Sequence, residues 1–144
     1  MILKNTLTVG LFAFILFVSC KADKKSEEKM DSSQMKQVMA IHDEVMPKMG
    51  KISKLVGELK AKVDTTEIGV QYEGAMTDLQ EAHKGMMGWM QDFGDRFDSD
   101  EIMNGKQLSA EKQSWLDEEE AKIKVVREQI NSSIKKAETL LEAN

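Results

Sequence analysis

The feature that most constrains the fold is an apolar pattern with alternating spacings of three and four residues over residues 35–63. This spacing places the side chains on one face of an α-helix, and such a long run is typical of helices that pack along their length. We therefore predict a helix over about residues 32–63. Its seam is Met35, Val38, His42, Val45, Met49, Ile52, Val56, Leu59 and Val63.

Two further segments repeat this pattern and predict helices over about residues 66–93 and 109–142. Asp64–Glu67 provides a stop and a new cap, and Ser109 can cap the last helix. The second seam is Met76, Leu79, His83, Met86, Met90, Phe93 and Phe97, extended backwards by Ile68, Tyr72 and Ala75. The third is Leu116, Ile123, Val126, Ile130, Ala137 and Leu141.

The connections between these segments are short, which favours antiparallel neighbours. Residues 94–105 are acidic and rich in helix breakers, but their spacing does not fit a calcium-binding loop, so we expect a solvated loop. The body contains a single proline and no alternating β-branched run. We predict an all-α domain over residues 32–144, an up-down-up antiparallel three-helix bundle that resembles a coiled coil.

The N-terminus has the features of a secretory signal. One lysine precedes an apolar run from Leu7 to Val18, which at about a dozen residues is shorter than the roughly 20 that span a bilayer. The run ends in Phe17-Val18-Ser19-Cys20, which resembles a bacterial lipobox. We expect residues 1–19 to be a lipoprotein signal peptide and Cys20 to be acylated, followed by a charged flexible tether over residues 20–31.

Composition restricts the chemistry of the mature chain. Cys20 is the only cysteine, so acylation would leave no thiol for a disulfide, a zinc site or a nucleophile. The net charge of −5 argues against nucleic acid as a partner of the body. No arrangement of a nucleophile with a base is recognisable, so we expect no enzymatic activity.

A repeated pattern of histidine and methionine offers one candidate site. His42, Met46 and Met49 have the same spacing as His83, Met87 and Met90, and positions i, i+4 and i+7 share a helix face. With a turn near residues 65–66, His42 lies opposite Trp89, and Glu119 lies beside them. Thioether and imidazole groups together favour Cu(I) among metals, so this slab is a candidate Cu(I) site, with Pro47 loosening the first helix nearby.

The same residues also have a structural interpretation. Methionine is an adaptable core residue, and a histidine in an apolar stripe is commonly satisfied by a carbonyl, a carboxylate or water. Haem is a third possibility for His and Met ligands, but three helices leave little room for a porphyrin. Core packing or a partner surface without any cofactor is therefore the default, and Cu(I) is the alternative.

The segments His42–Gly50 and Met86–Met90 resemble a group of small helical bacterial lipoproteins catalogued as viral A-type inclusion protein. The resemblance covers most of the mature chain and implies a helical fold and an envelope address. The familiar inner-membrane retention signal has aspartate after the acylated cysteine, whereas this chain has Lys21. We thus expect a lipoprotein anchored in the outer membrane through Cys20. Its expected role is structural or adaptor-like, with a protein partner or a second copy bound along the helix seam.

Overall fold

The protein is helical throughout the part of the chain that the computed structural model describes, which is residues 23–143, with side chains from residue 33 onward. The elements are α1 (Asp23–Val45), α2 (Lys48–Lys60), α3 (Glu67–Arg96), α4 (Ser99–Met103) and α5 (Ala110–Glu142). No strand occurs within this range, and the all-α prediction is confirmed. The proposed signal peptide, residues 1–19, and the proposed acylation site, Cys20, lie outside the described residues.

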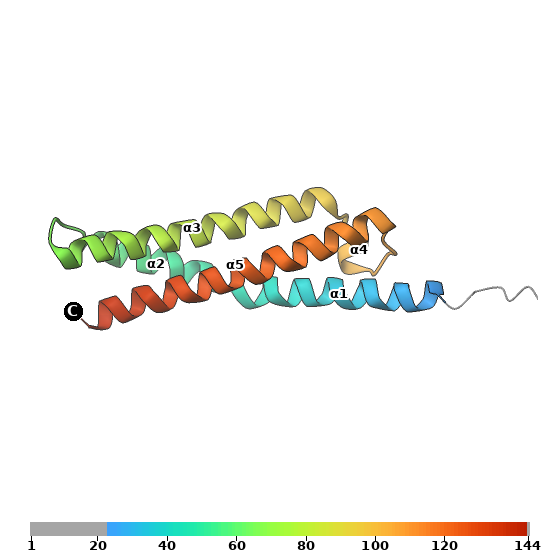
Figure 1. The fold of residues 1–144 in the computed structure, drawn as a ribbon, viewed down its shortest axis with the longest axis horizontal. Coiled ribbons are helices and arrows are strands. Elements are labelled where there is room, and N and C mark those ends of the chain that lie inside the picture. The colour runs from blue at the N-terminus through green and yellow to red at the C-terminus, as the bar shows by residue number, and fades with distance from the viewer. Residues whose placement is uncertain (1–22, 144) are drawn as a thin grey trace, which may run out of the picture.

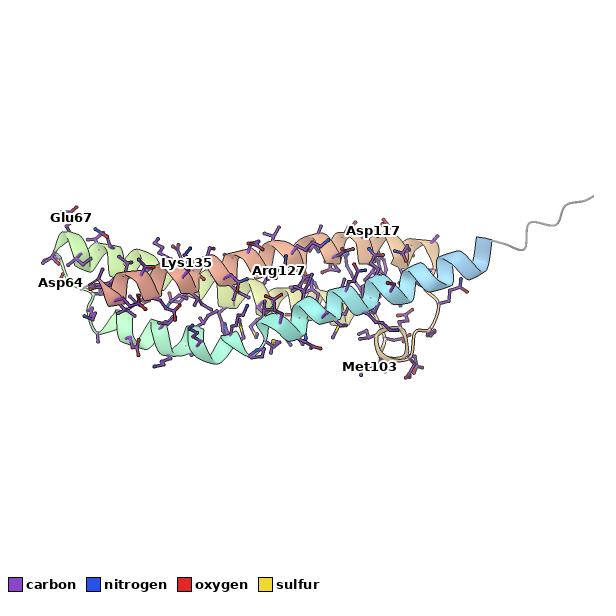
Figure 2. All side chains as sticks on the ribbon, turned by 90° about the horizontal axis from the view of Figure 1, so that it is seen from below. Asp64, Glu67, Met103, Asp117, Arg127 and Lys135 are labelled. Carbon is purple, nitrogen blue, oxygen red and sulfur yellow. The ribbon has the colours of Figure 1, made fainter. Side chains whose placement is uncertain are left out.

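The long helices lie side by side and form an elongated body (Figure 1). The first rod consists of α1 followed by α2, α3 returns alongside it, and α5 runs the length of the molecule again. α5 contacts α1, α2 and α3, while α2 also packs on α3. Asp64 and Glu67 mark the turn between α2 and α3 at one end of the body (Figure 2).

The first rod differs from the single helix predicted over about residues 32–63. It starts at Asp23, within the segment expected to be a tether, where lysine and glutamate have good intrinsic helix propensity. It is interrupted at Met46 and Pro47, as the proline predicted, because proline has no N–H and its ring clashes with the carbonyl four residues earlier. α1 packs mainly on α5, and α2 packs on both α3 and α5.

The predicted start signals are confirmed at both later helices. The Thr66 side chain accepts a hydrogen bond from the Gly69 amide at 3.1 Å, and Ser109 accepts one from the Lys112 amide at 3.2 Å. Each cap satisfies one of the amides that the first turn of a helix leaves free. The connection after α3 contains the short α4, which the sequence did not predict.

The core confirms part of each predicted seam and shifts the rest. On α3 the buried residues are Tyr72, Ala75, Leu79, Ala82, Met86, Trp89, Phe93 and Phe97. Tyr72 and Ala75 are buried as predicted, whereas Ala82 and Trp89 occupy the positions expected of His83 and Met90. Both sets have spacings of three and four, so the pattern could not separate them. The observed set buries the large indole of Trp89 and leaves His83 and Met90 at the edge of the core.

The other two seams are wider than predicted. Ile41 and Leu55 join the core of the first rod, whereas His42, Val56 and Val63 are only half-buried. On α5 the core also includes Glu119, Ser133 and Ile134, and Leu141 is half-buried. A rod that contacts two neighbours buries a broader stripe than the narrow seam of a two-stranded coiled coil, which explains these additions.

Candidate functional site

The first triplet lies beside the aromatic core of α3. The ring of His42 is 6.1 Å from that of Trp89, centroid to centroid, so the predicted pairing of these residues is confirmed. The His42 Nδ1 atom is 2.9 Å from an Asp43 carboxylate oxygen. The indole N–H of Trp89 donates to the Glu119 carbonyl at 3.2 Å, which places α5 at the same height. His42 therefore belongs to a layer formed by α1, α3 and α5.

The histidine of the second triplet lies at a different height along the bundle from His42. His83 lines a shallow pocket of about 300 Å³ with Gln80 of α3 and Ile52, Ser53 and Val56 of α2. It lies six residues before Trp89 on α3, which corresponds to about 9 Å along the helix axis. The two histidines thus occupy separate layers of the bundle, although the triplets run antiparallel over the same stretch of α1–α2 and α3.

The four methionines of the triplets also differ in their surroundings. Met49 is buried in the core and Met46 is half-buried against it, whereas Met87 and Met90 are 38% and 37% exposed. The cause is the register of α3, which turns Met86 and Trp89 inward instead. Among the described residues, no group of three or more histidine, cysteine or carboxylate side chains is placed to hold a metal ion.

The most unusual group near this layer is Glu119, a fully buried carboxylate on α5. Its Oε1 atom lies 2.8 Å from the Lys122 ammonium and 3.2 Å from the Arg96 guanidinium, while Oε2 has no hydrogen-bond partner among the described residues. Arg96 also pairs with the exposed Glu118 at 2.7 Å, and this hydrogen bond is the main reason why the pKa of Arg96 is raised. Arg96 further lies over the Trp115 ring, 5.6 Å from its centroid.

The sequence did not identify Glu119 as a core residue. It stands in the run Asp117-Glu118-Glu119-Glu120, which reads as a solvated face, and the i,i+4 rule pairs Glu118 with Lys122. In the structure Lys122 instead bonds Glu119. The available signal was the spacing of Glu119 from Leu116 and Ile123, three and four residues away within the apolar stripe of α5.

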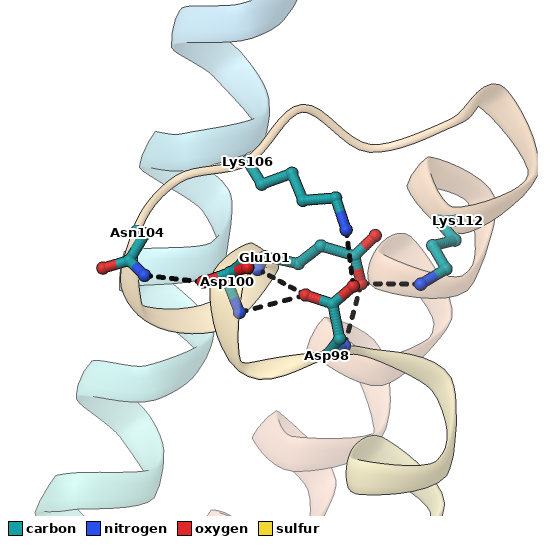
Figure 3. Close-up of polar contacts among 6 residues, drawn as sticks. All are labelled: Asp98, Asp100, Glu101, Asn104, Lys106 and Lys112. Atoms are coloured by element: carbon teal, nitrogen blue, oxygen red, sulfur yellow. Dashed lines mark hydrogen bonds and ion pairs between the residues drawn. The ribbon is translucent and has the colours of Figure 1, made fainter.

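The acidic connection between α3 and α5 forms a cluster of hydrogen bonds and ion pairs (Figure 3). Asp98 caps α4 by accepting from the amides of Asp100 and Glu101, and it pairs with Lys106 at 2.7 Å. The hydrogen bond from Lys106 is the main cause that lowers the pKa of Asp98. The buried Glu101 bonds the Asp98 amide at 2.8 Å and pairs with Lys112 at 2.6 Å. These carboxylates are occupied by lysines and amides of the chain itself.

A long, shallow groove runs between α3 and α5. One part, of about 520 Å³, is lined by Gly85, Gly88, Trp89 and Asp92 of α3 and by Ala121, Lys122, Val125 and Val126 of α5. Two further parts, of about 460 and 500 Å³, continue it toward the C-terminal end of α5. Val125 is 67% exposed, so it presents an apolar side chain to solvent at this part of the groove. Together the three hollows follow α3 and α5 over most of their shared length.

No known protein family matches the sequence, and comparisons with curated proteins and with solved structures found no significant similarity. In the described part of the chain, no helix combines the length and the apolar character needed to span a membrane.

Proposed function

We propose that this chain is a lipid-anchored protein of the bacterial cell envelope with a structural or adaptor role, exerted through helix-to-helix contacts. In this proposal the body acts as an up-down-up bundle of three rods, tethered through acylated Cys20 to the outer membrane. The resemblance to small helical lipoproteins supports the anchor. The observation that carries the adaptor role is the groove between α3 and α5, where an exposed valine lies beside glycines and alanine.

The physical reason is the shape and composition of this surface. Glycine and alanine let the backbone of another helix approach closely, and an exposed apolar side chain gains stabilisation when a partner covers it. A Cβ atom added at Gly88 would meet no atom within 4 Å, so this glycine is not required by packing within the chain. Helical glycine costs about 1 kcal/mol relative to alanine, a cost that a close external contact can offset.

The anchor is tested by growing cells that express the full chain with an alkyne-tagged fatty acid. We expect the tag on the wild-type protein and none on Cys20→Ser. Fractionation of the envelope membranes then tests the outer-membrane address.

The adaptor role is tested in the same cells with a photo-crosslinking amino acid at position 125 or 88. Crosslinked products are expected from these groove positions, whereas the matched control at Gly57, an exposed helical glycine on α2, should give none. Absence of any product from the groove would contradict the adaptor role.

Cu(I) binding is a second candidate function, favoured by the surroundings of His42. His42 and Met46 are both half-buried next to the interruption at Pro47, and the ring of Trp89 lies against His42. Because His83 lies in another layer, a site beside His42 would not include it. We expect anaerobic titration with Cu(I) against a competing chelator to depend on His42 and not on His83. Equal loss of binding in His42→Ala and His83→Ala would contradict this arrangement.

A further inference from the structure

The groove between α3 and α5 is long enough to hold another helix along most of its length. Its lining extends from Gln71 to Asp92 on α3 and from Ala121 to Leu140 on α5. About 20 residues of each helix therefore border it, which corresponds to about 30 Å at 1.5 Å per residue. The two walls come from neighbouring helices that pack on each other.

The charges that line this groove are separated by wall. Among the charged residues that line the groove, those from α3 are all acidic and those from α5 are all basic. The acidic residues are Asp78, Glu81 and Asp92, and the basic residues are Lys122, Lys135 and Lys136. Lys136 pairs with Asp78 at 2.6 Å and Lys122 pairs with Glu119, whereas Glu81 and Lys135 form no ion pair with another described residue. Figure 2 labels Lys135 on α5.

This separation of charge selects one way of pairing two copies. If a two-fold axis runs along the groove, the copies are parallel and the acidic α3 wall of each faces the basic α5 wall of the other. If the axis runs across the groove, the copies are antiparallel and acidic wall meets acidic wall, which is repulsive. Only the parallel pairing places an acidic wall opposite a basic wall along the groove.

The apolar part of the groove fits the same arrangement. A two-fold axis along the groove carries Val125 of one copy across to the α3 wall of the other. The α3 wall of this part includes Gly85 and Gly88. A Cβ atom at Gly88 would have open space around it, so there is room for a valine side chain from outside. The valine that is exposed in one copy thus meets the glycines of the other.

We propose that a second copy of this chain occupies the groove, with the two bodies parallel and related by a two-fold axis along α3 and α5. The inference rests on the adaptor role proposed for this groove and names its occupant. Parallel copies have their N-terminal ends at the same end of the assembly, so both lipid anchors would enter one membrane.

The size of the surface sets the expected affinity. A face about 30 Å long and about 20 Å wide, two helix diameters, buries about 600 Å² per copy. This is below the roughly 800 Å² per partner of standard stable interfaces, so we expect a dissociation constant in the micromolar range rather than the nanomolar range. Confinement to one membrane would raise the local concentration and favour the dimer.

The test uses the full chain in mild detergent, with sedimentation analysis over a concentration series. We expect a monomer–dimer equilibrium in the wild type. Gly74→Leu and Gly88→Leu, which fill the groove from positions with free space, should each raise the dissociation constant at least tenfold. Gly57→Leu is the matched control, because Gly57 is also helical and open but lies outside the groove, and it should leave association unchanged. Circular dichroism confirms that each variant is folded.

Orientation is tested by spin labels at Ser114, which is exposed on α5, in the Cys20→Ser background. Ser114 lies about 16 residues from the middle of the groove, so an antiparallel dimer separates the two labels by about 50 Å, whereas a parallel dimer keeps them within about 30 Å.

Three results of the measurements on the purified protein would overturn the proposal. They are a wild type that stays monomeric up to about 100 µM, association that is insensitive to both leucine variants, and the longer label distance. Crosslinks from position 125 to a different protein would also overturn it, while leaving the adaptor role intact.

Discussion

At the scale of single residues, Glu119 is a fully buried carboxylate whose two cationic partners both reach solvent. Arg96 and Lys122 have side-chain exposures of 28% and 45%, whereas Glu119 has none. Removing a buried charge together with its desolvation cost is often neutral or stabilising when an apolar side chain of similar volume replaces it. We expect Glu119→Met to raise the free energy of unfolding by about 1 kcal/mol, because both cations can rehydrate. Urea unfolding followed by circular dichroism measures this change.

Removing a cationic partner while Glu119 stays in place tests whether the buried charge itself causes the effect. Arg96→Met leaves the Glu119 carboxylate buried with one partner fewer and should lower the free energy of unfolding by about 2 kcal/mol. Glu118→Met removes the exposed partner of Arg96 and should change it by less than about 0.5 kcal/mol. A loss of stability in Glu119→Met as large as that in Arg96→Met would show that the carboxylate is a net contributor to the fold.

At the scale of elements, the interruption between α1 and α2 depends on one residue. Pro47 is exposed, and buried Val45 and Met49 continue the core stripe on both sides of it with a helical spacing of four. The side chains therefore keep the register of a continuous helix across the break. We expect Pro47→Ala to retain the fold and to stabilise it by about 1–2 kcal/mol. This is less than the roughly 3 kcal/mol difference in helix propensity, because packing on α3 and α5 still bends the rod.

Thermal and urea unfolding measure the effect of Pro47→Ala, with Gly50→Ala as the control. Gly50 lies in α2 close to the break, and a Cβ atom there meets nothing within 4 Å, so alanine should add about 1 kcal/mol through helix propensity alone. A destabilising Pro47→Ala together with a stabilising Gly50→Ala would contradict this expectation. It would mean that the packing of the core requires the helix interruption at Pro47.

At the scale of the whole molecule, the sequence predicted the all-α fold and the starts of α3 and α5, because periodicity and caps are local signals. Periodicity could not decide which of two sets of residues on α3 faces the core. His83 and Ala82 both satisfy a spacing of three and four, and only the partners on α2 and α5 decide which faces inward. Glu119 was missed because local charge patterning indicates a solvated face, whereas burial is a property of the assembled bundle.

The two ends of the bundle are packed with side chains of different size, and this leads to a prediction for the whole body. Where α2 packs on α3, the α3 core includes Ala75 and Ala82, both fully buried. Beyond Met86 it continues as Trp89, Phe93 and Phe97, whose neighbouring rings lie 4.8 and 4.9 Å apart. Small residues let helices approach closely, so the α2 end should tolerate no added volume.

Ala82→Leu tests this difference in packing. It adds three carbon atoms to a site with no exposed surface, and overpacking of this kind typically costs 1–3 kcal/mol, so we expect a loss of about 2 kcal/mol. Ala40→Leu is the matched control, because Ala40 is an exposed helical alanine on α1 and the same enlargement there should change stability by less than about 0.5 kcal/mol. Hydrogen exchange should then show the loss of protection first in α2, the shorter half of its rod. Equal stability of the two variants would mean that α2 can move away from α3 without cost, so that the close approach at this end is not a requirement of the fold.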